Sequence, residues 1–572
     1  MLRLLLLIGL LMGSTLPARA QSDSQAWMDT LGAIPIQHKG RVMPLDTYAR
    51  QLAVELTGRS QWSAERGPEG YAGRRPIELL CELWFNPQQY MGHPIIAIEN
   101  RPFKTRIGLD PARRFFTPME VARAPGINEV LAEFSQRRQN DPNAQPKGDE
   151  KLALELSGAL NRISEFATGK QLAIVPPVEG SEFRRVGVFE GDPGTEQVRE
   201  ALVAVRDAFV AGDAMEGPVN RLVDAVHAAG TLSDADARSV GLEVFYNHHR
   251  PWRKTSYAYG LSIVLFGLSR LFLRKPLVIA AIVCGLWGVG EHILGVGLRT
   301  AILQRVPASN TYEVLLWIGL VGIMLGLIGQ LFNRKAWYLF AGVCAAFASV
   351  LFAGLVPLQD QTNVMPAVLR SNYWLTVHVL TITASYGALA VASVLGHAYL
   401  FKYVILGKTA DAEASGPRAS HPLIVQIYRT MQVGLFLLTA GTILGGVWAA
   451  DSWGRFWGWD PKETWALISI VIYFVVLHAR HIRWLRDFGM ASSAVLAFIA
   501  IVWTFYGVNY VMATGLHSYG FGSGGELWVG LWALAEIVFM IVARVRFVQL
   551  RRAGRIADDR PIKIAKAAPK TA

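Results

Sequence analysis

The chain contains two kinds of stretch that differ in how apolar residues are spaced. Residues 21 to about 254 mix polar and apolar positions, with Pro and Gly turns and amphipathic patches such as Val198 to Ala229. This pattern predicts a mixed, mainly helical, water-soluble domain. From about Tyr257, apolar runs of the length that crosses a bilayer follow one another. They predict nine spans, at 257–273, 276–298, 313–332, 336–356, 374–403, 431–449, 465–484, 490–512 and 526–546.

The first 20 residues have the pattern of a secretory signal peptide. Arg3 precedes the apolar run Leu4 to Met12, and Ala18-Arg19-Ala20 supplies small residues before Gln21. These are the basic, apolar and cleavage regions of such a signal. A single short anchoring helix is the alternative interpretation. Both interpretations place the soluble domain, residues 21–254, outside the cytoplasm.

Basic residues predict the orientation of the spans. With the soluble domain outside, each inside turn is basic, as at Arg274 and Lys275, and the tail at 547–572 is basic as well. This distribution follows the positive-inside rule. We therefore expect a polytopic α-helical membrane protein with about nine transmembrane helices in residues 257–546 and a cytoplasmic tail, in a bacterial inner membrane.

Composition narrows the class of protein. Of 572 residues, 52% are hydrophobic and 17% are charged, which excludes an ordinary soluble enzyme. The net charge of +12 fits nucleic acid or a membrane, and the apolar spans favour membrane lipid and no nucleic acid. The three cysteines have no CxxC or CxxCH spacing, which excludes a disulfide scaffold, a zinc ribbon and covalently bound haem.

The soluble domain carries no catalytic signature. Its histidines lack the spacing of HExxH or of other metal-binding motifs. The block from Gly40 to Thr47 predicts a turn that leads into a helix capped by Asp46 or Thr47. Chemistry is therefore expected from the membrane part of the chain.

The outside loop between the sixth and seventh spans is rich in aromatic residues. Residues 448–465 read WAADSWGRFWGWDPKETW, with five tryptophans and one phenylalanine in 18 positions. An interfacial aromatic belt is one explanation, but a belt requires neither interleaved glycines nor the Asp-Pro-Lys-Glu run. A flat aromatic platform, which Gly454 and Gly458 let a ligand approach closely, suits a porphyrin. Arg455 or Lys462 would then pair with the porphyrin propionates.

Two histidines are predicted at the membrane level of this loop. His378 lies five positions into its span from the outside, and His517 lies in the outside loop GLHSY. One buried histidine alone is more often a packing residue. Two at matched depth beside a tryptophan platform favour bis-imidazole ligation of a flat cofactor.

Three further histidines lie in spans. His478 is about 20 Å along its helix from the outer end, too deep to share a cofactor with the outer pair. It is a functional candidate because it is ionisable at that depth, although an interfacial position beside Arg480 is the alternative. His292 lies at another depth by the same arithmetic, and His397 is interpreted as structural.

At these residues the chain resembles the CcsA (ResC) membrane subunit of the system II cytochrome c synthase. The stretch at 453–467 matches the tryptophan-rich WWD signature of that family, and related haem handlers of system I usually lack its Lys-Glu-Thr-Trp continuation. Further matches are WxxxHV at 374–379, LHAR around His478, and GVNY with GLHSY at 507–519. The segment at 307–313 also resembles the family, and the resemblance covers about residues 257 to 546.

The resemblance implies a haem site at the outer face. His378 and His517 would be its axial metal ligands, and these two with Asp460 are the catalytic candidates. His478 would ligate a second haem inside the membrane. The haem-binding candidates are Trp453, Arg455, Trp457, Trp459, Asp460, Lys462, Trp465 and His478.

The resemblance also implies a partner. In this family the second inner ligand comes from ResB (CcsB), and the soluble domain from Gly40 with the span at 257–273 resembles the later part of fused ResB–CcsA chains. The early transmembrane helices of ResB are absent from the resemblance. A separate ResB-like membrane subunit is therefore expected to supply the second inner histidine.

The function implied is that of a cytochrome c haem lyase, or holocytochrome c synthase. It would bind haem b and join the two vinyl groups to the thiols of a CxxCH segment in apocytochrome c. One alternative is a haem transporter or chaperone that delivers haem without attaching it. Another is a dihaem cytochrome b, which requires two complete histidine pairs.

Overall fold

The computed structural model describes residues 23–65, 67–141, 146, 148–167, 172–178, 180, 182–186, 192–333, 336–355, 371–407, 421–512 and 526–554. It divides into a polar unit that ends at His249 and a membrane unit that begins at Arg250. The predicted signal peptide at 1–20 and most of the tail lie outside the described residues.

The polar unit is mixed and mainly helical, as predicted. Its strands are β1 (Pro35–His38), β2 (Arg41–Pro44), β3 (Ile96–Ala97), β4 (Phe115–Phe116), β5 (Ala173–Val175) and β6 (Arg184–Arg185). Its helices are α2 (Asp23–Gly32), α3 (Leu45–Thr57), α4 (Pro76–Phe85), α5 (Pro87–Tyr90), α6 (Arg101–Arg106), α7 (Pro118–Arg123), α8 (Pro125–Asn140), α9 (Asp149–Ala167), α10 (Pro193–Ala211), α11 (Glu216–Ala229) and α12 (Asp234–His249). The amphipathic stretch at 198–229 thus forms parts of two helices.

Two small antiparallel sheets join these helices. One has the strand order β2-β1-β5-β6, and the other pairs β3 with β4. In the β1–β2 hairpin His38 pairs with Arg41, so the turn is Lys39-Gly40. Both turn residues have positive φ, 51° and 75°. This is the geometry of tight hairpin turns whose twist matches that of the flanking strands.

The predicted cap at Asp46 or Thr47 is wrong. Helix α3 begins at Leu45, and Pro44, with φ −65°, is its N-cap residue without a side-chain cap. Asp46 and Thr47 therefore lie inside the first turn, where they bind other side chains. The Arg50 Nε donates to Asp46 at 2.7 Å, and the Thr47 hydroxyl donates to Glu243 of α12 at 3.0 Å. Both side chains thus contribute to packing within the unit.

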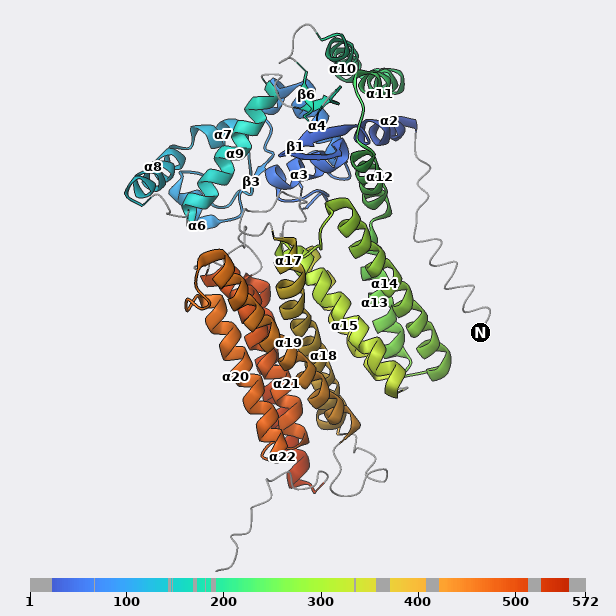
Figure 1. Ribbon diagram of the computed structural model, residues 1–572, viewed down its shortest axis with the longest axis vertical. Coiled ribbons are helices and arrows are strands. Elements are labelled where there is room, and N and C mark those ends of the chain that lie inside the picture. The colour runs from blue at the N-terminus through green and yellow to red at the C-terminus, as the bar shows by residue number, and fades with distance from the viewer. Residues whose placement is uncertain are drawn as a thin grey trace, which may run out of the picture. The chain divides into compact units, whose positions relative to one another are not determined.

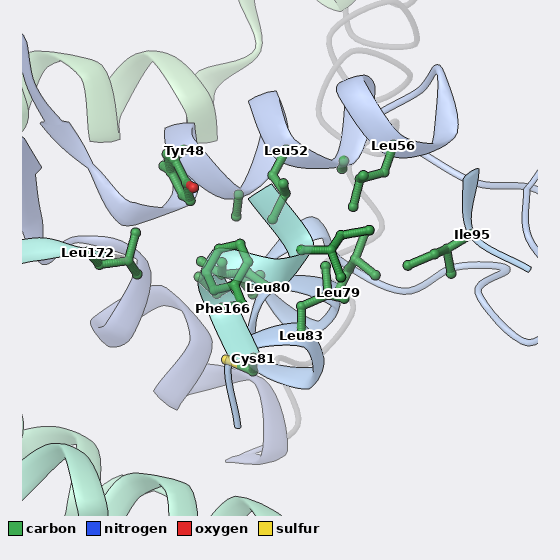
Figure 2. Packing of buried hydrophobic residues seen from close by; sticks show 14 of the residues in the cluster. Tyr48, Leu52, Leu56, Leu79, Leu80, Cys81, Leu83, Ile95, Phe166 and Leu172 are labelled. Atoms are coloured by element: carbon green, nitrogen blue, oxygen red, sulfur yellow. The ribbon is translucent and has the colours of Figure 1, made fainter. Parts of the chain in front are cut away.

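The core of the polar unit lies where α3, α4 and α9 meet. Figure 2 shows Leu52 and Leu56 of α3 beside Leu79 and Leu80 of α4, with Phe166 of α9 next to them. All five side chains are buried. Burial of apolar side chains contributes roughly 1.5–3 kcal/mol each, so these contacts account for the association of the three helices.

The membrane unit consists of long helices that run side by side (Figure 1). The α-helices are α13 (Pro251–Leu268), α14 (Arg274–Leu303), α15 (Thr311–Asn333), α16 (Ala336–Leu355), α17 (Asn372–Trp374), α18 (Leu380–Tyr399), α19 (Pro422–Trp453), α20 (Pro461–His481), α21 (Asp487–Val502) and α22 (Glu526–Arg552). Three π-helical segments, η2 (Leu375–Val379), η3 (Leu400–Ile405) and η4 (Trp503–Met512), continue α-helices without a break.

Eight helices within the described residues are long and apolar enough to cross a membrane. They correspond to eight of the nine predicted spans, and the chain is a multi-pass membrane protein. The span predicted at 257–273 overlaps α13, whose first turn includes the basic residues Arg253 and Lys254 and which is not among the eight. The crossing of α13, and with it the orientation of the soluble domain, stays a prediction.

Candidate functional site

A cavity opens among the ends of several membrane helices. It is partly open to solvent, and about 1070 Å³ of space free of protein atoms lies within it when the open solvent at its mouth is included. Its walls come from residues 308–311 before and at the start of α15, from η2 and α18, from α19, from the start of α20 and from η4. The residues lining it include His378, Tyr386, Thr442, Gly445, Gly446, Trp448, Trp457, Lys462, Glu463, Phe505 and Asn509.

His378 lies in the π-helical segment η2 and faces α19. Its Nδ1 is 2.8 Å from the carbonyl oxygen of Gly441. This hydrogen bond places the ring proton on Nδ1, so Nε2 carries the lone pair, which is the tautomer of a metal-binding imidazole. The orientation of His378 is therefore suited to ligation.

Two glycines of α19 allow this arrangement. A Cβ atom on Gly441 would lie 2.6–2.8 Å from Ile382 Cβ and backbone, and one on Gly445 would lie 2.6 Å from the His378 ring. Trp448, one turn further, meets the imidazole edge to face with ring centroids 5.7 Å apart. The sequence spacing GxxxG at 441–445 thus accommodates the imidazole, which sequence reasoning did not identify.

The tryptophan loop is not a flat platform. Trp457 lines the cavity, and Trp459 lies beside it with the ring plane turned by 87° at a centroid distance of 6.0 Å. Trp459 is 70% exposed and has φ +55°, a conformation that bulky residues rarely adopt. The expected platform is therefore reduced to Trp457 and Trp448 on the cavity wall.

The loop glycines have other roles than the expected close approach of a ligand. Gly454, with φ +69°, ends α19 in the left-handed conformation. At Gly458 a Cβ atom would coincide with the guanidinium group of Arg455, 1.6 Å away. Arg455 is exposed and is not among the residues that line the cavity. Of the two cations proposed for the propionates, Lys462 is the one at the cavity.

Asp460 and Glu463 form a capping box at the start of α20. Asp460 accepts a hydrogen bond from the Lys462 backbone N–H at 3.0 Å, and Glu463 accepts from the N–H groups of Gly458 and Asp460 at 2.8 and 3.2 Å. The cap directs the first turn of α20, and with it Lys462, toward the cavity. The Lys462 Nζ donates to Asn509 Oδ1 of η4 at 3.1 Å.

The cap at Asp460 gives a prediction that distinguishes a structural role of its side chain as a helix cap from a direct role of its charge. Asp460→Ala is expected to lower the stability of the start of α20 by about 1 kcal/mol, whereas Asp460→Asn keeps an equally good cap. We therefore expect Asp460→Asn to keep the thermal stability of the unchanged chain and Asp460→Ala to lose part of it, as measured by thermal unfolding in detergent. For the haem site that the sequence resemblance implies, haem binding should follow the same order. Loss of haem binding in a stable Asp460→Asn variant would instead show that the charged carboxylate itself takes part.

One polar wall of the cavity comes from a segment noted in the sequence only for its resemblance. Ser309, Asn310 and Thr311 line the cavity. The side chain of Asn310 accepts from the Glu313 N–H at 2.8 Å and so caps α15, and the Thr311 hydroxyl accepts from Tyr510 of η4 at 2.9 Å. The segment could have been found by its polar residues immediately before an apolar span.

Like Trp459, two further predicted tryptophans lie outside the cavity lining. Trp465 packs edge to face against Trp503 at 5.7 Å and so joins α20 to η4. Trp453 is the last residue of α19. His517 lies outside the described residues, so its placement stays a prediction.

His478 lies on an exposed face of α20. Its Nδ1 is 2.9 Å from the Phe474 carbonyl oxygen, and its ring stacks on that of Phe474 at 4.0 Å. Helix α14, which carries His292, lies on the opposite side of the bundle from α20 (Figure 1). His292 is fully buried, with Nε2 2.8 Å from the Leu316 carbonyl oxygen and Nδ1 3.2 Å from the Tyr259 hydroxyl. His292 is thus engaged in packing α13 and α14 against α15.

His397 also has a partner within the bundle. Its Nε2 lies 2.8 Å from Glu536 Oε2 of α22, and its ring stacks on Phe539. This pair joins α18 to α22. Sequence reasoning missed Glu536 because the two residues are 139 positions apart.

The thiol of Cys81 does not suit nucleophilic chemistry. Cys81 is fully buried, and burial raises the pKa of its thiol far above the usual range. Within the described part of the chain there is no group of three or more His, Cys, Asp or Glu residues that would hold a metal ion. The cavity lining presents the imidazole of His378, two tryptophans and the polar side chains of Lys462, Glu463 and Asn509.

The fold and the cavity define a multi-pass helical membrane protein with an imidazole and tryptophans at one helix-end site. The family model "Cytochrome C assembly protein" matches residues 308–517, which include every element that lines the cavity. The cytochrome c biogenesis protein CcsA of Synechococcus sp. (strain RCC307) is 38% identical over 245 residues, covering 37% of this chain and 76% of that protein. CcsA of Parasynechococcus marenigrum is 32% identical over 305 residues, covering 48% and 91%.

The chain belongs to the CcsA family of cytochrome c biogenesis proteins. A longer match is protein NrfI of Wolinella succinogenes, 28% identical over 536 residues. That match covers 88% of this chain, which is more than the membrane unit alone can supply, so it extends into the polar unit. The chain spans 55% of the length of NrfI.

Proposed function

We propose that this chain binds haem b at the cavity beside His378 and attaches it to apocytochrome c. The observation that carries the proposal is the imidazole of His378, held by the Gly441 carbonyl with Nε2 as the lone-pair nitrogen, in a cavity walled by Trp448 and Trp457. An oriented imidazole is a common haem ligand, and aromatic rings suit the porphyrin face. His517 is proposed as the second ligand from the same side of the membrane.

Charge at the cavity supports one orientation of the haem. Lys462, supported by Asn509, is a cation at the wall, and the haem propionates are anions that pair well with an ammonium group. The apolar residues Leu375, Val379 and Phe505 also line the cavity. We propose that the propionates lie toward Lys462 and the vinyl groups toward apolar wall.

The attachment step needs no nucleophile from this chain. Each substrate thiol adds across one vinyl group, with the sulfur bonding to one vinyl carbon and the thiol hydrogen transferred to the other, so the addition is redox-neutral. The chain would contribute proximity and orientation, which are worth several kcal/mol of a barrier. His378 or His517 must release the iron when the substrate histidine binds, so one of them is the weaker ligand.

An inner haem site with a partner is the second part of the proposal. His478 presents an imidazole on an exposed face of α20, and His292 is engaged on the other side of the bundle. A ResB-like membrane subunit would supply the second inner ligand. The polar unit, which the NrfI match reaches, is proposed to resemble the later part of ResB and to lie outside the inner membrane of a bacterium.

Reconstitution tests the proposal against the alternative of a haem chaperone. Purified chain, alone and with a ResB-like subunit, is supplied with reduced haem and a CxxCH peptide, and the peptide is analysed for thioether-bound haem by mass spectrometry. We expect a b-type pyridine haemochrome from the chain and thioether product from the assembly. Transfer of haem without thioether formation would support the chaperone. A chain that takes up no haem in either sample would overturn the proposal.

A further inference from the structure

The polar wall of the cavity is held by a carboxylate that lies behind it. Glu313, in the first turn of α15, is fully buried. Its Oε2 accepts hydrogen bonds from the Ser309 N–H and hydroxyl at 3.0 and 2.8 Å. Arg305 lies 3.3 Å from the same oxygen. One carboxylate oxygen thus fixes both ends of the segment 305–309.

The other oxygen of Glu313 binds a different helix. The guanidinium group of Arg299, near the end of α14, donates to Glu313 Oε1 at 2.9 Å. The Arg299 side chain is only 2% exposed, and its guanidinium carbon also lies 5.4 Å from the centre of the Tyr312 ring. Breaking a buried pair strands an uncompensated charge, so this contact strongly determines where the wall lies.

A second polar contact joins the same two helices. His292 of α14 bonds the Leu316 carbonyl of α15 and the Tyr259 hydroxyl of α13. Gly288 and Gly295 permit the close packing of the hairpin, because Cβ atoms there would lie 2.4 and 2.7 Å from the rings of Tyr259 and Trp252. The hairpin of α13 and α14 is therefore attached to α15 by buried polar contacts at two levels.

This hairpin lies before residue 308, where the family match begins. Its residues are also not among those that line the cavity. We infer that the α13–α14 hairpin braces the cavity wall at 308–311, with Arg299 and Glu313 as positioning residues for haem binding. The inference deepens the proposed function and rests on it for the ligand, but the position of the wall can be measured without haem.

The first experiment measures how accessible the cavity wall is at position 308. Ala308 is 4% exposed and lines the cavity. Ala308→Cys is introduced into full-length chain in which Cys81, Cys284 and Cys344 are alanine, and the rate of maleimide labelling is measured in detergent without haem. In the Glu313→Gln background we expect labelling to accelerate by about fivefold or more, because local opening exposes the thiol.

Glu536→Gln is the matched control. It also replaces a buried membrane carboxylate that binds a basic side chain, here His397, but α22 contributes no residue to the cavity lining. We expect Glu536→Gln to leave the labelling rate at position 308 unchanged. Equal acceleration in both variants would mean general loosening of the bundle and would overturn the inference, as would unchanged labelling in Glu313→Gln.

The second experiment measures the affinity for haem. Haem is titrated into each variant, and affinity is taken from the absorbance of the bound form. We expect Glu313→Gln and Arg299→Gln to weaken haem binding by about fivefold or more, the cost of losing charged hydrogen bonds. The effects should be non-additive in the double variant, since both act through one contact. Additive effects would overturn the inference.

If Glu313→Gln alone does not fold, the Arg299→Gln/Glu313→Gln double variant replaces it in the labelling experiment, because it removes both members of the buried pair together. The labelling rate of its introduced thiol at position 308 is then compared with that in the Glu536→Gln background. If the unmodified chain binds no haem, the proposed function fails, and the labelling result still decides whether the hairpin positions the wall. Faster labelling with unchanged haem affinity would overturn the role in haem binding.

Discussion

His378→Ala is expected to abolish haem retention and cytochrome c maturation, and exogenous imidazole is expected to restore part of both. The change leaves the cavity and the Gly441 carbonyl in place but removes the proposed iron ligand. Free imidazole can occupy the space and supply the missing nitrogen. We expect at least about a tenfold loss of haem affinity, equivalent to ~1.4 kcal/mol, measured by haem titration and by the pyridine haemochrome of purified protein.

His397→Ala is the matched control for His378→Ala. It removes an imidazole from the same continuous helix, but one that is bound to Glu536 away from the cavity lining. We expect it to retain haem at the outer site and to show no response to imidazole. Normal maturation in an inserted His378→Ala variant would remove His378 from the proposed ligands.

The second large effect is expected from the tryptophan loop. Loss of both Trp457 and Trp459 should release haem although His378 remains, because the proposed aromatic contact with the porphyrin would be lost. Trp457 should contribute more to this effect than Trp459, because Trp457 lines the cavity and Trp459 is 70% exposed. We expect Trp457→Ala alone to lower haem affinity by about tenfold or more, and Trp459→Ala to have the smaller effect.

Haem content per inserted chain checks this prediction, with Trp484→Ala as the control. Trp484 is an exposed tryptophan in the turn after α20 and is not among the cavity-lining residues. Retention of haem and of activity in the Trp457→Ala/Trp459→Ala variant would favour the aromatic-belt interpretation. If Trp459→Ala lowered haem affinity more than Trp457→Ala, the haem would have to be placed at the exposed loop and not inside the cavity.

The long apolar runs made the membrane helices predictable. A run of about 20 apolar residues has few alternatives to a spanning helix, and eight such helices are found in the described residues. The position of His378 near the tryptophan loop was also predictable, because the sequence places both at the same end of neighbouring spans. The first span was harder to predict, since the first turn of α13 carries the basic residues Arg253 and Lys254 and the helix packs along α14.

The shape of the site depends on tertiary contacts that cannot be predicted from the sequence pattern. The rings of Trp457 and Trp459 are nearly perpendicular, and the backbone of Trp459 has a positive φ that its residue type does not predict. Gly458 was expected to face a ligand, but the guanidinium group of Arg455 occupies that space. The Glu313 and Arg299 pair joins two helices, and no local periodicity marks it. Local pattern therefore predicted elements, and tertiary contacts determined the roles of single residues.

The π-helical segment η2 determines in which direction His378 points from the helix at 375–405. A π turn closes its hydrogen bond one residue later than an α turn, so η2 acts as a one-residue insertion that resets the angular phase of the helix. The N-terminal end of this helix can aim His378 at α19, while α18 keeps a different stripe against the bundle core. Deleting Val379, which lies between His378 and α18, would place His378 one position closer to α18 and change its angle around the helix axis by up to about 100°, the angle of one residue in a 3.6-residue turn. The imidazole would then turn from the cavity although its own residue is unchanged.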